Sequence, residues 1–137
     1  MPGRTGGIRV LIAEDHAEMA DVLSTYLTAA GYAVAVARDG VEAGVLAVRL
    51  APAVAILDAN MPGCTGWALL HAWKRDGEEA ETLGAIPRPG RPPAVIMLTG
   101  DDVFPPESAL ADAVLRKPAS LRAIAAAVAA VVGATAP

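Results

Sequence analysis

Side chains that could do chemistry follow four of the five short apolar runs in the chain. Glu14 and Asp15 follow the first run and Asp58 ends the third, while Thr99 ends the fourth and Lys117 follows the fifth. Each residue alone has a structural explanation, because helix N-termini and turns commonly use such side chains. No structural requirement makes four runs agree, however, so we expect these residues to form one site.

The three carboxylates limit the chemistry that such a site could perform. Two ionised carboxylates about 5 Å apart repel each other by roughly 3 kcal/mol at an effective dielectric constant near 20, and one lysine does not cancel the repulsion among three acids. Either one acid keeps its proton or a hard divalent cation binds, and oxygen ligands favour Mg²⁺ in the second case. The hydroxyl of Thr99 and the ammonium of Lys117 would suit the oxygens of a transferred phosphoryl group.

Two other classes of protein that use similar sheets fit this pattern less well. A flavodoxin or dinucleotide-binding protein needs a phosphate-binding loop rich in Gly, Ser or Thr after its first strand, where this chain reads Glu-Asp-His-Ala-Glu. A phosphatase similar to haloacid dehalogenases has a second Asp two residues after its nucleophile. This chain has Asn60 at that distance from Asp58.

The elements that must position these residues are short apolar strands that alternate with helical patterns. Five strands and about five helices in strict alternation predict an α/β fold with a parallel sheet and helices on both of its faces. The runs near 8–13, 54–57 and 94–98 are apolar on both faces, as central parallel strands must be, whereas the small AVAVA run at 33–37 suits an edge. Ligands of such sheets bind at the carboxyl ends of the strands, so the polar residues share one rim.

Two of the expected helices have apolar stripes at three- and four-residue spacing. The stripe of the helix after the first strand consists of Met19, Val22, Leu23, Tyr26 and Leu27. The stripe of the last helix consists of Leu121, Ile124, Val128, Val131 and Val132. We expect Gly31 to end the first of these helices and Ser120 to cap the N-terminus of the last.

Length and composition limit the class of protein further. A chain of 137 residues allows a single domain, which we expect to span residues 1–137 with its core at about 7–133. The formal net charge of -4 and the lack of a Lys/Arg cluster argue against a nucleic-acid partner. The longest uninterrupted apolar run, 123–132, is about half of the roughly 20 residues that a membrane span needs.

The remaining features of the sequence concern location and one connection. The N-terminus lacks the apolar segment of a signal peptide, and a single cysteine, Cys64, cannot form an internal disulfide. We therefore expect a soluble, cytoplasmic protein with no membrane partner. The proline-rich stretch at about 84–93 predicts an extended connection along the surface, either a tolerated loop insertion or a docking segment.

Together these residues resemble the receiver domain of two-component response regulators over nearly the whole chain. The resemblance is carried by Glu14-Asp15, GYAVAVARDGVEA, DANMPGCTGWALL, Thr99-Gly100 and Lys117-Pro118, with Asp58, Met61-Pro62 and Gly66 at the spacing of the family. It implies a flavodoxin-like (βα)5 three-layer sandwich with strand order 2-1-3-4-5.

The resemblance also implies a phosphoacceptor site. Asp58 would accept a phosphoryl group from the phosphohistidine of a sensor histidine kinase or a histidine phosphotransfer protein. Asp15, Asp58 and the backbone carbonyl of Asn60 would bind Mg²⁺, and Glu14 would reach the ion through water. Such a protein catalyses only its own phosphorylation and dephosphorylation.

Further roles follow from the same resemblance. Lys117 would contact one phosphoryl oxygen, Thr99 would hydrogen-bond another, and the Lys117-Pro118 peptide bond would be cis. We expect a stand-alone receiver, a monomer or weak dimer, that switches its binding to a protein target which the sequence does not identify. Two alternatives stay open: a receiver-like docking module that works without phosphorylation, and a small phosphohydrolase with an aspartyl-phosphate intermediate.

Two departures from the family pattern affect the expected switch. The family usually has Tyr or Phe three residues before its lysine, where this chain has Val114, which has no ring to swing inward. Pro105-Pro106 interrupts the segment where a fourth helix should run, so we expect that helix to be short or irregular.

Overall fold

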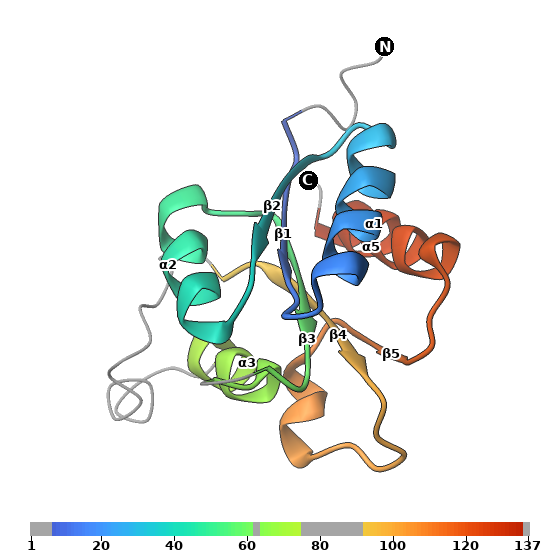
Figure 1. The fold of residues 1–137 in the computed structure, drawn as a ribbon. Coiled ribbons are helices and arrows are strands. Elements are labelled where there is room, and N and C mark those ends of the chain that lie inside the picture. Colours follow the sequence, from blue (N-terminus) through green and yellow to red (C-terminus); the bar gives the residue numbers. More distant parts are fainter. Residues whose placement is uncertain (1–6, 62–63, 75–91, 136–137) are drawn as a thin grey trace.

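The computed structural model describes residues 7–61, 64–74 and 92–135, and in this part of the chain a parallel sheet lies between two layers of helices (Figure 1). The strands are β1 Arg9–Ala13, β2 Ala33–Ala37, β3 Val54–Asp58, β4 Ala94–Thr99 and β5 Ala113–Arg116. The helices are α1 Ala17–Ala29, α2 Gly40–Leu50, α3 Gly66–Lys74, the 3-10 helix η2 Pro106–Leu110 and α5 Leu121–Thr135. The strand order β2-β1-β3-β4-β5 confirms the predicted fold class.

Two expectations concern segments at the limits of this description. Most of the proline-rich connection expected at about 84–93 lies outside the described residues, as do Pro62 and Gly63. Among the residues that the structure describes, no helix combines the length and the apolar content needed to cross a bilayer.

Alternate residues of the strands enter two separate cores because successive side chains of a strand point to opposite faces. Val10 and Ile12 of β1 pack with residues of α1 and α5, whereas Leu11 and Ala13 pack with residues of α2 and α3. Every residue of β3 and β4 is buried, as predicted for central strands of a helix-covered sheet. The AVAVA run forms β2, which lies at one edge of the sheet, again as predicted.

The apolar stripe predicted for α1 is only partly buried. Leu23 and Leu27 are fully buried, but Val22 is 50% exposed and Tyr26 is 39% exposed. The sequence contains two neighbouring rows at three- and four-residue spacing, and the row with small Ala20 is the one that faces the sheet. The stripe named from the sequence therefore contains residues of both rows, because periodicity alone does not say which row packs against the sheet.

The ends of the two predicted helices agree with the sequence signals. Gly31 follows Ala30, the C-cap of α1, and has a positive φ of 106°; its N–H donates to the carbonyl of Thr28 at 3.0 Å. Ser120 precedes α5, and its hydroxyl accepts a hydrogen bond from the N–H of Ala123 at 3.0 Å. The stripe of α5 is confirmed, because Ile124, Val128 and Val131 are buried.

The fourth helical segment is short, as the sequence predicts. Only the 3-10 helix η2 forms between β4 and β5, and it begins at Pro106 directly after Pro105. A residue that precedes proline is restricted to extended backbone, so Pro105 takes the N-cap position and the helix begins only at Pro106. The segment packs against α3.

Gly66 allows α3 to begin close to the end of β3. Its N–H donates to the carbonyl of Ala59 at 3.1 Å. A Cβ at this position would collide with the backbone carbonyl of Asp58 and would lie 2.8 Å from Cε of Met97. The position of Asp58 therefore depends on a residue without a side chain at the start of α3.

We expect Gly66→Ala to lower the free energy of unfolding by about 1 to 3 kcal/mol, because the added methyl group must displace backbone at the end of β3. Urea unfolding of both proteins measures the difference. The matched control is Gly133→Ala in α5, where a Cβ meets no atom within 4 Å. That change should raise stability by about 0.5 to 1 kcal/mol, and an equal loss of stability in both variants would contradict the packing explanation.

Candidate functional site

The register of the sheet brings the predicted site residues to one rim. Asp58 at the end of β3 is paired with Leu98, so that Thr99 lies one residue further along β4. The N–H of Lys117 donates to the carbonyl of Thr99 at 2.7 Å, directly after β5. The N–H of Glu14 donates to the carbonyl of Ala37 at the end of β2 in the same way.

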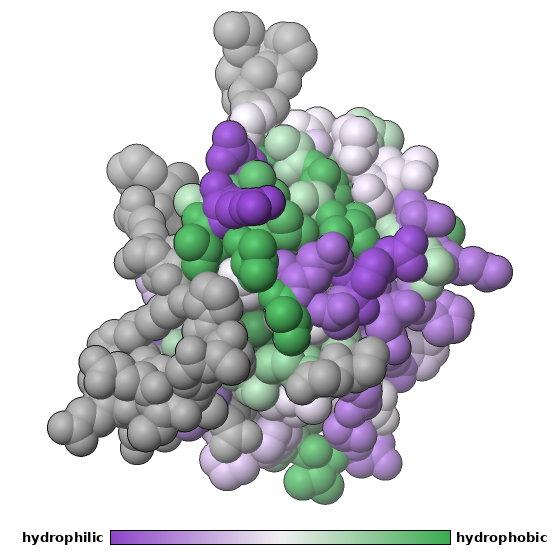
Figure 2. Space-filling view, turned by 60° about the vertical axis from the view of Figure 1, so that its left-hand side comes forward, coloured by the Kyte–Doolittle hydropathy of each residue, from purple (hydrophilic) through white to green (hydrophobic). Residues whose placement is uncertain are grey.

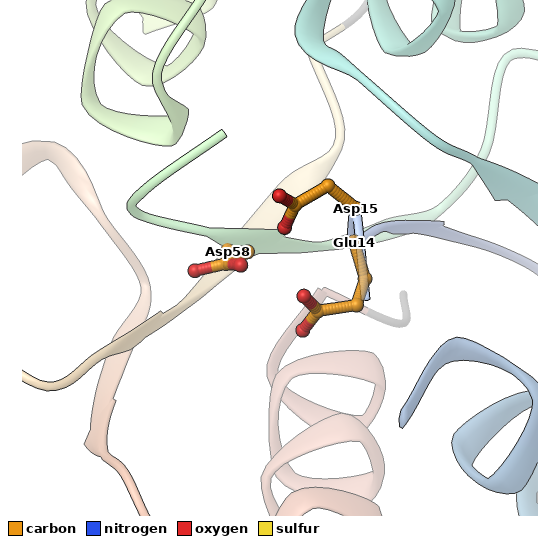
Figure 3. Close-up of side chains that lie close together, drawn as sticks. All are labelled: Glu14, Asp15 and Asp58. Carbon is orange, nitrogen blue, oxygen red and sulfur yellow. The ribbon is translucent and has the colours of Figure 1, made fainter. Parts of the chain in front are cut away.

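The three acids form one cluster in which their carboxylate oxygens lie within 4.8 Å of one another. Glu14 and Asp15 come from the end of β1 and Asp58 from the end of β3, and Figure 3 shows their carboxylates turned toward the same space. Glu14 is 2% exposed and Asp58 is 4% exposed, whereas Asp15 is exposed to solvent. The predicted proximity of the three acids is therefore present in the structure.

Lys117 supplies the positive charge beside this cluster. Its Nζ lies 3.1 Å from Oδ1 of Asp58 and 3.8 Å from Oε1 of Glu14. The Lys117-Pro118 peptide bond is cis, as the family resemblance implied. One ammonium group thus contacts both buried carboxylates.

Burial and crowding change the acidity of Glu14. Burial of the carboxyl group, and then the neighbouring Asp58 carboxylate, raise its pKa from 4.5 to about 7, although Lys117 and a hydrogen bond from the backbone N–H of His16 oppose the change. That N–H lies 3.3 Å from Oε2 of Glu14. Without a cation, the cluster therefore reduces its repulsion by keeping a proton on Glu14 near neutral pH.

Asn60 and Thr99 lie at the same rim as the cluster, and each takes part in a local hydrogen bond there. The N–H of Asn60 donates to Oδ1 of Asp58 at 3.1 Å. Asp58 thus makes the hydrogen bond of an Asx turn, which is the structural explanation for an aspartate at the end of a strand. The hydroxyl oxygen of Thr99 accepts a hydrogen bond from the N–H of Asp101 at 3.1 Å. Thr99 is fully buried and Asn60 is exposed.

A hollow of about 540 Å³ opens over the cluster. It is lined by Glu14, Asp15, His16, Glu18, Met19, Val22, Asp58 and Lys117. Met19 and Val22 belong to the row of α1 that does not face the sheet, and sequence reasoning missed their place at the site. The second apolar row on α1 was the signal, since an apolar row that is not in the core must lie at the surface.

The donor set fits a hard divalent cation. All three clustered side chains offer carboxylate oxygens, which Mg²⁺ prefers over nitrogen or sulfur ligands. Oε1 of Glu14 is buried and has no hydrogen-bond partner in the part of the chain that the structure describes. A buried acceptor without a donor is costly, and a cation would satisfy it.

Comparison with known proteins places the chain in a family. The family model of the response regulator receiver domain matches residues 10–129. The response regulator MprA of Mycobacterium sp. is 30% identical over 117 residues, which cover 84% of this chain and 51% of that protein. The DNA-binding dual master transcriptional regulator RpaA of Synechocystis sp. is 36% identical over 73 residues, which cover 53% of this chain and 30% of that protein.

Solved structures of receiver proteins share the fold of this chain. The receiver domain of the Francisella response regulator 1452 superposes with a TM-score of 0.76 at 24% identity, covering 95% of this chain and 100% of that one. The Vibrio cholerae chemotaxis protein CheY4 has a TM-score of 0.68 at 28% identity, covering 90% of this chain and 97% of that one. This chain thus spans about half or less of the curated relatives named above, but nearly the whole of these two solved domains.

The raised pKa of Glu14 predicts how pH affects stability. Its pKa is about 7 in the folded protein and 4.5 as the ordinary value, so the folded state binds this proton more tightly and loses stability as pH rises from about 4.5 through 7. We expect the free energy of unfolding of Glu14→Gln to rise by about 1 to 3 kcal/mol relative to that of wild type over that pH interval, measured without divalent cations. Urea unfolding at several pH values measures this gain. Parallel profiles for the two proteins would contradict it, and Glu18→Gln, which removes an exposed carboxylate of the same hollow, is the control.

Proposed function

The chain belongs to the response regulator receiver domain family of two-component systems, and on this premise we propose that Asp58 is its phosphoryl-accepting residue. The observation that carries the proposal is the contact of 3.1 Å between Nζ of Lys117 and Oδ1 of Asp58 inside the three-acid cluster. A buried carboxylate flanked by an ammonium group and a site for a cation is equipped to receive a phosphoryl group.

The proposed reaction is a displacement at phosphorus. A carboxylate oxygen of Asp58 forms the new oxygen–phosphorus bond, while the phosphorus–nitrogen bond of a phosphohistidine breaks and its electron pair stays on the imidazole. The reaction involves little covalent chemistry for the protein beyond the nucleophile, so positioning and charge neutralisation provide the catalysis. Lys117 already contacts Asp58 and would contact an oxygen of the incoming group.

Mg²⁺ is the proposed cofactor. Asp15, Asp58 and the backbone carbonyl of Asn60 would hold it, with Glu14 contributing through water. When bound, the ion offsets the repulsion between the carboxylates and the phosphoryl oxygens. Glu14 favours this arrangement once it is ionised, because the cation replaces its proton as the positive partner.

Thr99 would hydrogen-bond a second phosphoryl oxygen. Its hydroxyl oxygen is used as an acceptor by the N–H of Asp101, which leaves the hydroxyl hydrogen available for donation. Movement of Thr99 toward the phosphoryl group would carry the Asp101 loop with it. This coupling is the route by which occupancy of the site would reach the surface.

The proposed partners are proteins. A sensor histidine kinase or histidine phosphotransfer protein would supply the phosphoryl group in the cytoplasm, and a further protein would bind the switched surface. RpaA is named for DNA binding, but this chain matches 30% of its length. The formal charge of -4 gives no electrostatic reason for these residues to contact DNA. We treat residues 1–137 as one receiver unit in this proposal.

We expect wild-type protein to gain a labile phosphate adduct with acetyl phosphate and Mg²⁺, measured as intact mass, and Asp58→Asn to gain none. Asp21→Asn, which neutralises an exposed carboxylate on α1, is the matched control and should keep the adduct. Omission of Mg²⁺ should prevent it. If wild type gains no adduct, even from a kinase phosphohistidine, the docking module becomes the better explanation, and sustained turnover of phosphate esters would favour a phosphohydrolase.

We expect little rearrangement of η2 and β5 on activation. Val114 is partly buried against the α3 side of the core and has no ring to swing. Asp112 accepts a hydrogen bond from the N–H of Val95 at 2.7 Å and pairs with Lys74 at 3.3 Å, which ties this region to β4 and α3. Amide chemical shifts recorded with Mg²⁺ and beryllofluoride should change mainly near Asp58 and Thr99. Large shifts throughout residues 104–116 would contradict a muted switch.

A further inference from the structure

The outer side of the edge strand β2 carries backbone groups that point away from the sheet. The N–H of Ala33 donates to the carbonyl of Ile8, and the carbonyl of Ala37 accepts from the N–H of Glu14. In a parallel ladder the residues that face the neighbouring strand alternate with residues that face away. Ala33, Ala35 and Ala37 therefore face β1, and the N–H and C=O groups of Val34 and Val36 face outward.

The row of outward-facing groups on Val34 and Val36 is short, and the N–H groups on either side of it are already bonded. On one side the N–H of Tyr32 donates to the carbonyl of Leu27 at 3.2 Å, and on the other the N–H of Arg38 donates to Oε1 of Glu42 at 2.7 Å. The N–H and C=O groups of Val34 and Val36 have no hydrogen-bond partner within 7–61, 64–74 and 92–135. Edge strands are usually protected from further pairing by charges, prolines or bulges, and AVAVA has none of these.

We propose that a second copy of this chain pairs with β2, antiparallel, about a two-fold axis at Ala35. Val34 then lies opposite the partner's Val36 in a hydrogen-bonded pair, and Val36 lies opposite the partner's Val34. The two pairs supply four hydrogen bonds, which use all four open groups of each copy. The sequence AVAVA is the same in both directions, so the pairing also matches small and β-branched side chains.

Helix α2 adds a self-complementary surface beside this strand. Glu42 lies on the β2 side, because its carboxylate bonds Arg38, and Leu46 packs in the same cluster as Ala35. Arg49 follows Glu42 by seven residues and thus lies on the same side of the helix. The two-fold axis brings Leu46 toward the partner's Leu46 and Glu42 toward the partner's Arg49, so that opposite charges meet on both sides of an apolar centre.

The surface beside β2 is apolar in keeping with such a contact. A hollow of about 280 Å³ is lined by Arg9, Val10, Leu11, Ala33, Val34, Ala35, Leu50 and Pro52. Figure 2, which brings the α2 side forward, shows hydrophobic side chains grouped next to strongly hydrophilic ones. An interface of one short strand and one helix from each copy is small, so the dimer should be weak and concentration-dependent.

Such a dimer would leave both acid clusters free. The strands of the two copies run in opposite directions across the pair, while each cluster lies at the carboxyl ends of its own strands. The two Asp58 side chains therefore lie at opposite rims of one continuous sheet. Each copy could therefore accept a phosphoryl group while the dimer stays intact.

Sedimentation velocity of the full chain over a concentration series tests the charge pairs. We expect wild type to form dimers and Arg49→Glu to weaken them about tenfold or more, because Glu42 then faces a like charge. The double variant Glu42→Arg with Arg49→Glu should restore them, and Arg122→Glu, an exposed site on α5, should leave them unchanged. A wild type that is monomeric at every concentration, or an Arg49→Glu variant that associates like wild type, would overturn the proposal.

A cysteine cross-link tests the register. In a Cys64→Ser background, Ala35→Cys should form a disulfide dimer under mild oxidation, since directly opposed residues of a non-hydrogen-bonded pair lie about 4.5 Å apart at Cα, within the range for a disulfide. Ala33→Cys is the matched control and should cross-link far less, because the partner's Ala37 lies opposite it. Equal cross-linking at the two positions would refute the pairing about Ala35.

Discussion

Repulsion among three carboxylates at one rim of the sheet is the constraint on which the rest of the site depends. The oxygens of Glu14, Asp15 and Asp58 lie within 4.8 Å of one another, and two of these side chains are almost fully buried. Such an arrangement persists only with compensation, which Lys117 and the proton on Glu14 provide in the absence of metal. Because the rim needs positive charge, it favours the binding of a cation, and of a phosphoryl group that is accompanied by a cation.

The strands beneath this concentration of charge are buried on both faces. β3 and β4 are buried on both faces and hold Asp58 and Thr99 at fixed positions. Gly66 lets α3 approach the end of β3 so closely that a side chain would not fit. The energy of two apolar cores therefore supports a polar site that would not be stable alone.

The parts of the molecule that would communicate with partners differ from one side of the sheet to the other. Near β5, a 3-10 helix and Val114 replace the elements that the family usually moves, and Asp112 ties them to β4 and α3. At the opposite edge, the outward backbone groups of Val34 and Val36 in β2 have no hydrogen-bond partner among the residues that the structure describes. The side near β5 is thus tied to its neighbours by side-chain contacts, whereas the β2 edge is not tied in this way within the described residues.

The sequence by itself determined the order of the elements and the residues of the rim. Apolar runs that are followed by polar residues are sufficient to predict the residues of the rim. A parallel sheet brings the carboxyl ends of its strands to one side whatever the details of packing. Periodicity could not decide which of two apolar rows on α1 faces the sheet, since both have helical spacing. Only the tertiary structure decided that choice, the burial that raises the pKa of Glu14, and the position of β2 at the edge of the described sheet, because each depends on which surfaces neighbouring elements cover.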